Sequence, residues 1–249
     1  MKTLSAFVLC AAVIFGAAVT AAHATQTPVN LGSAASFAVF GAAGVTSTGN
    51  TVITGDLGVY PIAGTAVTGF SGENGGGAGI VNGTIEDNDT APETTAAQHA
   101  AASLTIAIND AKGRTGAFTA VGPGSSYVDL GNATLSPGLY TSATTVALTG
   151  NLTLSGNGVY IFQIGTGLTV ADFSNVILAN GAQAANVFWQ VGTLASLGAS
   201  DAFVGNILAG AGITMGSGTT LVGRALSQTD VTFIDNTVTL PPSPKKSKK

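Results

Sequence analysis

The sequence predicts a mostly β protein, a three-sided β-helix with one long α-helix packed alongside. The first observation is a segment that recurs between Asn132 and Pro241, in which a polar residue is followed by alternating apolar and hydroxyl residues. Its copies start at positions 132, 151, 175, 201, 219 and 236, so successive starts are 19, 24, 26, 18 and 17 residues apart. A repeat near this length is typical of a solenoid, in which each coil buries its apolar face against its neighbours.

The second observation is that two further short β-like segments lie between successive copies. Three short strands per turn, joined by Gly, Asn and Asp corners, describe a coil with three sides. Side chains that alternate along each strand then point into the coil and out of it in turn. One family of segments covers residues 138–141, 159–162, 187–190, 206–209 and 224–227, and the other covers 145–148, 168–170, 194–197, 213–215 and 231–234.

Residues 25–72 repeat the same three-strand order and form a separate first portion of the solenoid. The pattern then breaks at residues 71–79, a glycine-rich loop that lacks the Gly-Lys-Ser/Thr of a phosphate-binding loop. The acidic run 86–89 lacks the glycine and the distal Glu of an EF-hand, and we interpret it as a loop before a helix.

The third observation is one convincing α-helix, predicted over residues 91–113. Residues 90–93 form a capping box with proline in the first turn, and Gly113 ends the helix. An apolar stripe of this length needs a partner surface, and the side of the β-helix is the available one. The predicted stripe consists of Ala97, Ala101, Leu104, Ile108 and Ala111.

The two ends of the chain differ from the body. Residues 1–24 have a positive start, an apolar stretch and the small-x-small sequence Ala22-His23-Ala24, which predicts a secretory signal peptide and a secreted, extracellular protein. A signal anchor is the alternative. The domain itself is predicted over residues 25–240, and residues 241–249 are predicted to be a basic disordered tail. Removal of residues 1–24 removes Cys10, the single cysteine of the chain.

Composition argues against several classes of function. Only 8% of the 249 residues are charged, and between Thr25 and Leu240 three basic residues face 12 acidic ones, a net charge of 3 − 12 = −9. Such an acidic body is unsuited to nucleic acid. Single Asp residues at turn positions, without basic neighbours, are typical of backbone caps rather than of a catalytic pair. We therefore predict no enzyme, no cofactor, no metal and no small-molecule substrate.

The outward residues of the recurring segments are the candidate binding site. If the leucines and valines of these segments point inward, the residues between them form uncharged columns about 4.8 Å apart along the stack. Threonine presents a methyl beside a hydroxyl on a stiff rotamer, so a regular array of threonines can hold water in ordered positions. An uncharged exposed face of this size indicates an interaction site, although β-branched residues also favour strands in general. The predicted site residues are Thr51, Ile53, Thr134, Ser136, Thr153, Ser155, Ile177, Ala179, Ala202, Val204, Thr220, Val222, Thr237 and Thr239.

Several motifs together resemble the microbial β-helical ice-binding (antifreeze) proteins over roughly residues 28–241. They lie at residues 30–40, 50–59, 83–85, 111–114, 187–190, 205–209 and 223–226. The resemblance implies a right-handed, discontinuous β-helix whose N-terminal coil packs beside the C-terminal one. It also implies adsorption to ice through one flat face, which Thr51, Thr134, Thr220 and Thr239 match by strand position.

The sequence therefore predicts a monomeric protein whose partner is the ice crystal surface and which inhibits ice growth and recrystallisation. The alternative is a non-enzymatic adhesion or polysaccharide-binding β-helix module. An exposed aromatic platform would favour sugar binding, and the predicted face contains only Phe203, which is expected to be buried.

Overall fold

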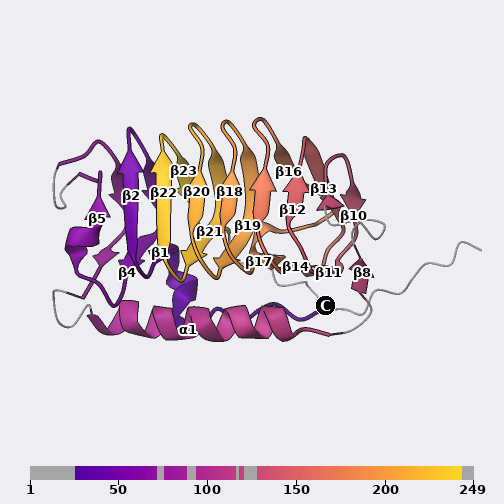
Figure 1. Cartoon of the computed structure of the whole chain (residues 1–249), viewed down its shortest axis with the longest axis horizontal. Coiled ribbons are helices and arrows are strands. Elements are labelled where there is room, and N and C mark those ends of the chain that lie inside the picture. Colours follow the sequence, from indigo (N-terminus) through magenta and orange to yellow (C-terminus); the bar gives the residue numbers. More distant parts are fainter. Residues whose placement is uncertain (1–25, 72–75, 89–93, 116–117, 121–127, 243–249) are drawn as a thin grey trace, which may run out of the picture.

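The structure is a computed structural model that describes residues 26–71, 76–88, 94–115, 118–120 and 128–242. In these residues the protein forms a three-sided β-helix flanked by one long helix. The strands of each side pair in parallel from coil to coil, and helix α1 (Thr94–Gly113) runs along the whole stack (Figure 1). The prediction of a mostly β solenoid with one helix alongside is confirmed.

The first side of the solenoid faces α1. Its strands follow the order β8-β11-β14-β17-β19-β21-β1-β4-β7, and the later halves of the long strands β19 and β21 belong to it. Their bounds are β8 Phe118–Ala120, β11 Gly138–Ser142, β14 Tyr160–Ile164, β17 Val187–Val191, β19 Ala202–Ala209, β21 Thr220–Ser227, β1 Phe37–Gly41, β4 Asp56–Val59 and β7 Ile85–Glu86.

The second side is a separate eight-stranded sheet in the order β5-β2-β22-β20-β18-β15-β12-β9. Its strands stand side by side in the foreground of Figure 1. They are β5 Val67–Thr68, β2 Gly44–Thr48, β22 Asp230–Ile234, β20 Ile213–Met215, β18 Ala195–Leu197, β15 Leu168–Val170, β12 Val146–Leu148 and β9 Val128–Asp129.

The third side is built from the recurring segments with polar starters. The first halves of β19 and β21 lie in it, so the first and third sides are continuous at these two strands. The other strands of this side are β10 Thr134–Leu135, β13 Asn151–Ser155, β16 Asn175–Ala179, β23 Thr237–Thr239, β3 Val52–Thr54 and β6 Ile80–Asn82. Elements of the solenoid are also connected by three short 3-10 helices, η1 Gly32–Ser36, η2 Gly64–Ala66 and η3 Ala184–Asn186.

The stack is discontinuous along the chain. Strand β1 lies between β21 and β4, and β2 lies between β22 and β5. The N-terminal coils therefore extend the stack from the C-terminal coil rather than from the coil that follows α1. This arrangement confirms the expected packing of the N-terminal coil beside the C-terminal one.

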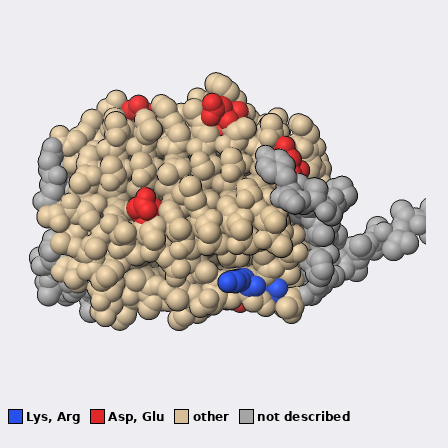
Figure 2. All heavy atoms as spheres, viewed as in Figure 1, with Lys and Arg blue, Asp and Glu red and all other residues tan. Residues whose placement is uncertain are grey.

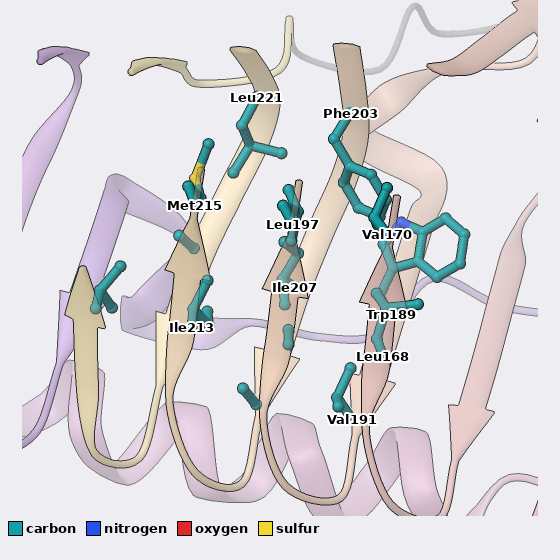
Figure 3. Packing of buried hydrophobic residues seen from close by; sticks show 14 of the residues in the cluster. Leu168, Val170, Trp189, Val191, Leu197, Phe203, Ile207, Ile213, Met215 and Leu221 are labelled. Carbon is teal, nitrogen blue, oxygen red and sulfur yellow. The ribbon is translucent and has the colours of Figure 1, made fainter. Parts of the chain in front are cut away.

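The inside of the β-helix is a continuous apolar core. Strands of the second side contribute Leu168, Val170, Leu197, Ile213 and Met215, and these side chains point into the same interior as Phe203 and Leu221 (Figure 3). An aromatic stack runs through the core from Tyr140 through Phe162 and Trp189 to Phe203, with ring centroids 5.2, 3.9 and 5.0 Å apart. The alternation of apolar residues in the sequence therefore identifies the inward side correctly.

Helix α1 packs against the first side through a second apolar cluster. Ala97, Leu104, Ile108 and Ala111 of the predicted stripe are buried, whereas Ala101 is partly exposed. The C-terminus of the helix is fixed by Gln163 of β14, whose Nε2 donates to the carbonyl oxygens of residues 111, 112 and 114 at 2.8, 3.2 and 2.8 Å. The helix therefore covers one side of the solenoid, which leaves the second and third sides as candidate binding faces.

Some predicted features lie outside the described residues. These are the signal peptide at residues 1–24, the capping box at residues 90–93 and the lysines of the tail. Within the described part of the chain, no helix has the length and apolar character needed to cross a membrane.

Candidate functional site

The second side carries a column of hydroxyl side chains on its outer surface. Its central outward position is Thr or Ser in six successive strands, and the pairing register places these six residues directly beside one another. We call this surface the hydroxyl face, and its column consists of Thr169, Ser196, Thr214, Thr232, Thr46 and Thr68.

The hydroxyl groups in the column are regularly placed and partly fixed. Neighbouring strands hold equivalent residues about 4.8 Å apart. Thr214 Oγ1 donates to Ser196 Oγ at 3.3 Å, and Thr68 Oγ1 donates to Thr46 Oγ1 at 3.2 Å. Threonine has a stiff χ1, so both its methyl and its hydroxyl repeat with the coil. Each threonine of the column therefore presents one methyl and one hydroxyl group, and this pair of groups repeats from coil to coil.

Charged groups lie mainly around the hydroxyl face rather than on its column. Figure 2 shows this side of the molecule, with acidic side chains mostly at the margins, one on the body of the face, and basic side chains near one end of the helix side. Asp230, the first residue of β22, is exposed, two positions before Thr232. Asp129 marks one end of the column, beyond Ala147.

The carboxylate of Asp129 has a structural role. Its Oδ1 accepts hydrogen bonds from the backbone N–H groups of Gly131 and Thr149 at 2.8 and 3.0 Å. Burial raises the pKa of Asp129, but the hydrogen bonds from Gly131 and Thr149 favour the ionised form, and the net pKa is lowered. This charge caps a turn at the end of the stack.

The third side carries most of the residues that the sequence predicts as a binding site, and we call it the mixed face. Two outward columns run along it. One contains Asn151, Asn175, Ala202, Thr220, Thr237, Val52 and Ile80, and the other contains Thr134, Thr153, Ile177, Val204, Val222, Thr239, Thr54 and Asn82.

Twelve of the fourteen predicted site residues are exposed or partly exposed on or beside the mixed face. Exposed are Thr134, Ser136, Ile177, Ala202, Thr220, Val222 and Thr237, and partly exposed are Thr153, Ser155, Ala179, Val204 and Thr239. These residues carry no charge, as expected. However, Ile177, Val204 and Val222 interrupt the hydroxyl groups of the second column, so the mixed face offers no continuous hydroxyl array.

The prediction that Thr51 and Ile53 point outward is wrong. Both side chains are 0% exposed, and β3 presents Val52 and Thr54 instead. The sequence Asn50-Thr51-Val52 looks like Asn236-Thr237-Val238, but the strands pair one residue away from that alignment, with Thr237 beside Val52. A shift of one residue moves every side chain to the opposite face of a strand.

Thr51 belongs to a buried polar ladder at the corner between the hydroxyl face and the mixed face. Its Oγ1 accepts a hydrogen bond from the backbone N–H of Asn236 at 3.2 Å. In the same way, Thr219 Oγ1 accepts from Asp201 N at 3.0 Å, and Asp201 Oδ1 accepts from Ser174 N at 2.9 Å. Each of these side chains satisfies a backbone donor of the neighbouring coil, so the ladder fixes the coils in register.

Asp201 is the ionisable member of this ladder. It is 2% exposed, and its Oδ2 has no hydrogen-bond partner among the described residues. Burial raises the pKa of Asp201, partly offset by backbone hydrogen bonds from Ser174 and Gly198. Its position in the ladder explains why an acidic residue stands at the start of one of the recurring segments without appearing on either face.

The mixed face is also bordered by a hollow. A space of about 450 Å³ opens beside it, between the 180–184 turn and the C-terminal segment. It is lined by Leu178, Gly181, Ala182, Gln183, Ala184, Val222 and Pro242. This side of the stack is therefore less flat than the hydroxyl face, where every strand continues the same register.

The hydroxyl column was missed by the sequence reasoning, which considered outward residues only in the segments with polar starters. The signal was present as the short triplets Leu168-Thr-Val170, Ile213-Thr-Met215 and Val231-Thr-Phe233. In each triplet, two apolar residues that point inward flank one hydroxyl residue that must point outward. Among the described residues, no group of three His, Cys, Asp or Glu side chains is placed to hold a metal ion.

The fold therefore belongs to the class of discontinuous three-sided β-helices, with a helix on one side and two weakly charged open faces. Residues 39–239 match the protein family described as Ice-binding-like. The chain is 37% identical to an ice-binding protein of Flavobacterium frigoris (strain PS1), over 86% of this chain and 76% of that protein. It is 38% identical to an ice-binding protein of Nostoc sp. (strain HG1), over 92% and 79% of the two chains.

Solved structures agree with these relatives. The fold matches the crystal structure of an ice-binding protein from an Antarctic biological consortium, with a TM-score of 0.78 and 38% identity over 88% of this chain and 93% of that one. It also matches an ice-binding protein with antifreeze activity from an Arctic yeast, with a TM-score of 0.79 and 34% identity over 89% and 98%. The chain belongs to the Ice-binding-like family.

Proposed function

We propose that this protein adsorbs to ice and that the hydroxyl face makes the contact. The observation that carries the proposal is the uninterrupted column of six Thr and Ser side chains on successive coils. Membership of the Ice-binding-like family supports ice as the partner, and the chemistry of the column supports this particular face.

The physical argument rests on repetition. Ice is a lattice of water molecules without net charge, so a complementary surface needs regularly spaced hydrogen-bonding groups and few charges. Threonine methyls restrict the positions of nearby waters, and the hydroxyls hydrogen-bond to them. A rigid β-helix keeps these groups in place before binding, so little conformational entropy is lost on adsorption.

The mixed face is the second candidate surface for the same function. Its outward residues are uncharged, and Thr220 and Thr237 are adjacent there. However, its hydroxyl groups are interrupted by Ile177, Val204 and Val222, and a hollow lies beside it. For this reason we assign the ice contact to the hydroxyl face.

Adsorption explains inhibition of ice growth. Molecules fixed on an ice surface force the ice front to curve outward between them, and curved ice melts more readily than flat ice. Growth and recrystallisation therefore stop within a range of temperature below the melting point. The chain acts in this scheme as a monomer, is secreted after removal of residues 1–24, and uses no catalytic step or cofactor.

The test uses two residues of the same coil. Thr214 of β20 lies on the hydroxyl face, and Thr220 of β21 lies on the mixed face. Thr214→Tyr and Thr220→Tyr each place the same bulky ring on one face only. We expect Thr214→Tyr to abolish thermal hysteresis and recrystallisation inhibition, whereas Thr220→Tyr retains most of both.

Circular dichroism and the unfolding temperature of both variants serve as controls for the fold. If Thr220→Tyr loses ice activity and Thr214→Tyr keeps it, the mixed face is the ice-binding face. If neither variant changes ice activity, the contact lies on neither of the two open faces. If the unmodified mature chain is not captured by ice in an ice-affinity experiment, the proposed function itself is wrong.

A further inference from the structure

Phe173 is an exposed aromatic residue in an unfavourable backbone conformation. Its side chain is 71% exposed, more than any other large hydrophobic side chain in the described residues. Its φ is 61°, in the left-handed region that bulky residues rarely adopt. The exposed ring buries little apolar surface, and the left-handed backbone conformation is unfavourable for a bulky residue. Stability of the fold therefore does not explain why phenylalanine stands at this position.

The neighbouring coils show what this corner needs structurally. Equivalent corner residues stack on one another through backbone hydrogen bonds from each corner N–H to the next coil, as in the bonds from Phe173 to Ala199 and from Ser200 to Ser217. The corner residues of the next coils are Ser200, Gly218, Asp235 and Gly49, and all have positive φ. Small or turn-forming residues are therefore sufficient for the corner.

Polar groups surround the corner at Phe173. Asn175 Nδ2 donates to Asn151 Oδ1 at 2.8 Å and to the carbonyl oxygen of Phe173 at 3.3 Å. Asn151 Nδ2 and Asn175 Oδ1 have no hydrogen-bond partner within the described part of the chain, so this bonded pair of amides leaves one donor and one acceptor for a ligand. The carboxylate of Asp172 is exposed and accepts from Ala199 N at 2.7 Å.

We propose that Phe173, Asn151 and Asn175 form a binding site for a neutral polysaccharide, separate from the ice-binding face. The C–H groups on one side of a pyranose ring pack against the face of an aromatic ring. A sugar hydroxyl both donates and accepts, and it therefore matches the donor of Asn151 and the acceptor of Asn175. Asp172 supplies a further acceptor for a second hydroxyl group.

The surroundings of Phe173 favour a sugar over a protein partner or ice. A protein interface normally buries a larger apolar centre around its aromatic residues, whereas Phe173 has Asp172, Asn175 and Ser200 nearby. Phe173 lies at a corner outside the columns of both open faces, and Asn151 and Asn175 belong to the first column of the mixed face rather than to the hydroxyl face. Binding there leaves the hydroxyl face open, so the protein could be retained on an extracellular polysaccharide while it contacts ice.

The experiment is affinity electrophoresis of the mature chain, residues 25–249, produced in bacteria so that the Asn151-Leu-Thr153 glycosylation sequence stays unmodified. Native gels contain hydroxyethyl cellulose, laminarin, mannan, dextran or xylan. Phe173→Ser copies Ser200 of the next coil, and Phe173→Trp keeps an aromatic face. Leu194→Ser is the matched control, because Leu194 is another exposed apolar residue (43%) beside the hydroxyl face.

We expect at least one of these polysaccharides to retard the chain and Leu194→Ser equally. Phe173→Ser should bind that polysaccharide at least about tenfold more weakly, Phe173→Trp should retain binding, and all variants should keep their ice activity. The proposal is overturned if none of the five polysaccharides retards the chain or if Phe173→Ser is retarded like the unmodified chain. It is also overturned if Phe173→Ser loses only ice activity, which would assign the ring to the ice contact.

Discussion

The hydroxyl face and the mixed face are built from the same coils with the same spacing, yet they differ in chemistry. Strands of the hydroxyl face are short, so most contribute one central outward residue, and that residue is Thr or Ser in six successive strands. Strands of the mixed face contribute two outward columns, in which Asn, Ala, Ile and Val residues separate short runs of Thr. A regular backbone therefore does not by itself give a regular surface.

Both faces depend on the same interior. The buried ladder at their shared corner contains Ser174, Asp201, Thr219, Asn236 and Thr51, and the apolar core lies behind both sheets. Changes in the interior should therefore affect the two faces together, whereas changes to outward residues should affect one face only.

The largest effect is expected for Thr51→Tyr. Thr51 is fully buried and accepts a hydrogen bond from Asn236, so a tyrosine there overpacks the corner and removes the bond. We expect a loss of about 3 kcal/mol or more in the free energy of unfolding, measured by chemical denaturation. Thr54→Tyr, three residues away on the exposed side of β3, should unfold at nearly the same denaturant concentration as the unmodified chain. Equal stability of the two variants would contradict the assigned register.

A similar loss is expected for Trp189→Ala. Trp189 is 0% exposed and stacks on Phe162 with ring centroids 3.9 Å apart. Its removal should destabilise the protein by about 3–5 kcal/mol. Ice activity measured well below the unfolding temperature should nevertheless remain, because neither face loses an outward residue. Loss of ice activity with unchanged stability would contradict this expectation, because it would show that Trp189 supports the ice-binding face without stabilising the fold.

A smaller effect is expected when one hydroxyl is removed without changing side-chain shape. Thr169→Val on the hydroxyl face should weaken adsorption to ice by about fivefold, the equivalent of one hydrogen bond. Thr153→Val makes the same change on the mixed face and should leave adsorption unchanged. Ice-affinity partitioning of the two purified variants provides the measurement. A larger effect from Thr153→Val would favour the mixed face.

The smallest effect is expected for Asp201→Asn, a change in pH dependence. Because the folded-state pKa of Asp201 is raised above its unfolded value, its stabilising contribution is complete below the unfolded pKa, about 3.9, and is lost as pH rises through the folded pKa. Asp201→Asn should remove this contribution to the pH dependence. Thermal unfolding from pH 3 to pH 7 tests this expectation, and an unchanged slope would contradict the burial of an ionisable group in the ladder.

The sequence predicts the fold well because the repeat and the alternation are local. Leu152, Leu154, Phe203, Leu221 and Val238 all point inward as their positions in the alternation indicate. The helix and its partner surface also follow from periodicity, although the buried positions include Ala100 and Ala107 rather than Ala101. These features depend on patterns that extend over a few residues.

The error at Thr51 has a different origin. The register of β3 is set by pairing with β23, and the hydrogen bond from Asn236 to Thr51 joins residues 185 positions apart. Such pairing leaves no mark in the local sequence, and the alternation within residues 50–53 alone does not show which side chains point outward. The hydroxyl column was missed for another reason, because outward residues were considered only in the segments with polar starters, and the column lies on a different side of the solenoid.

The assignment of the ice contact is tested most directly by blocking either face of one coil in two separate variants and comparing each variant with itself before and after blocking. A chain of residues 25–249 does not contain Cys10, so Thr232→Cys on the hydroxyl face and Thr237→Cys on the mixed face each provide a unique site for a bulky maleimide. Recrystallisation inhibition is measured before and after labelling. We predict that labelling of Thr232→Cys abolishes inhibition and that labelling of Thr237→Cys leaves most of it. Loss of inhibition only after labelling of Thr237→Cys would contradict the assignment of ice binding to the hydroxyl face.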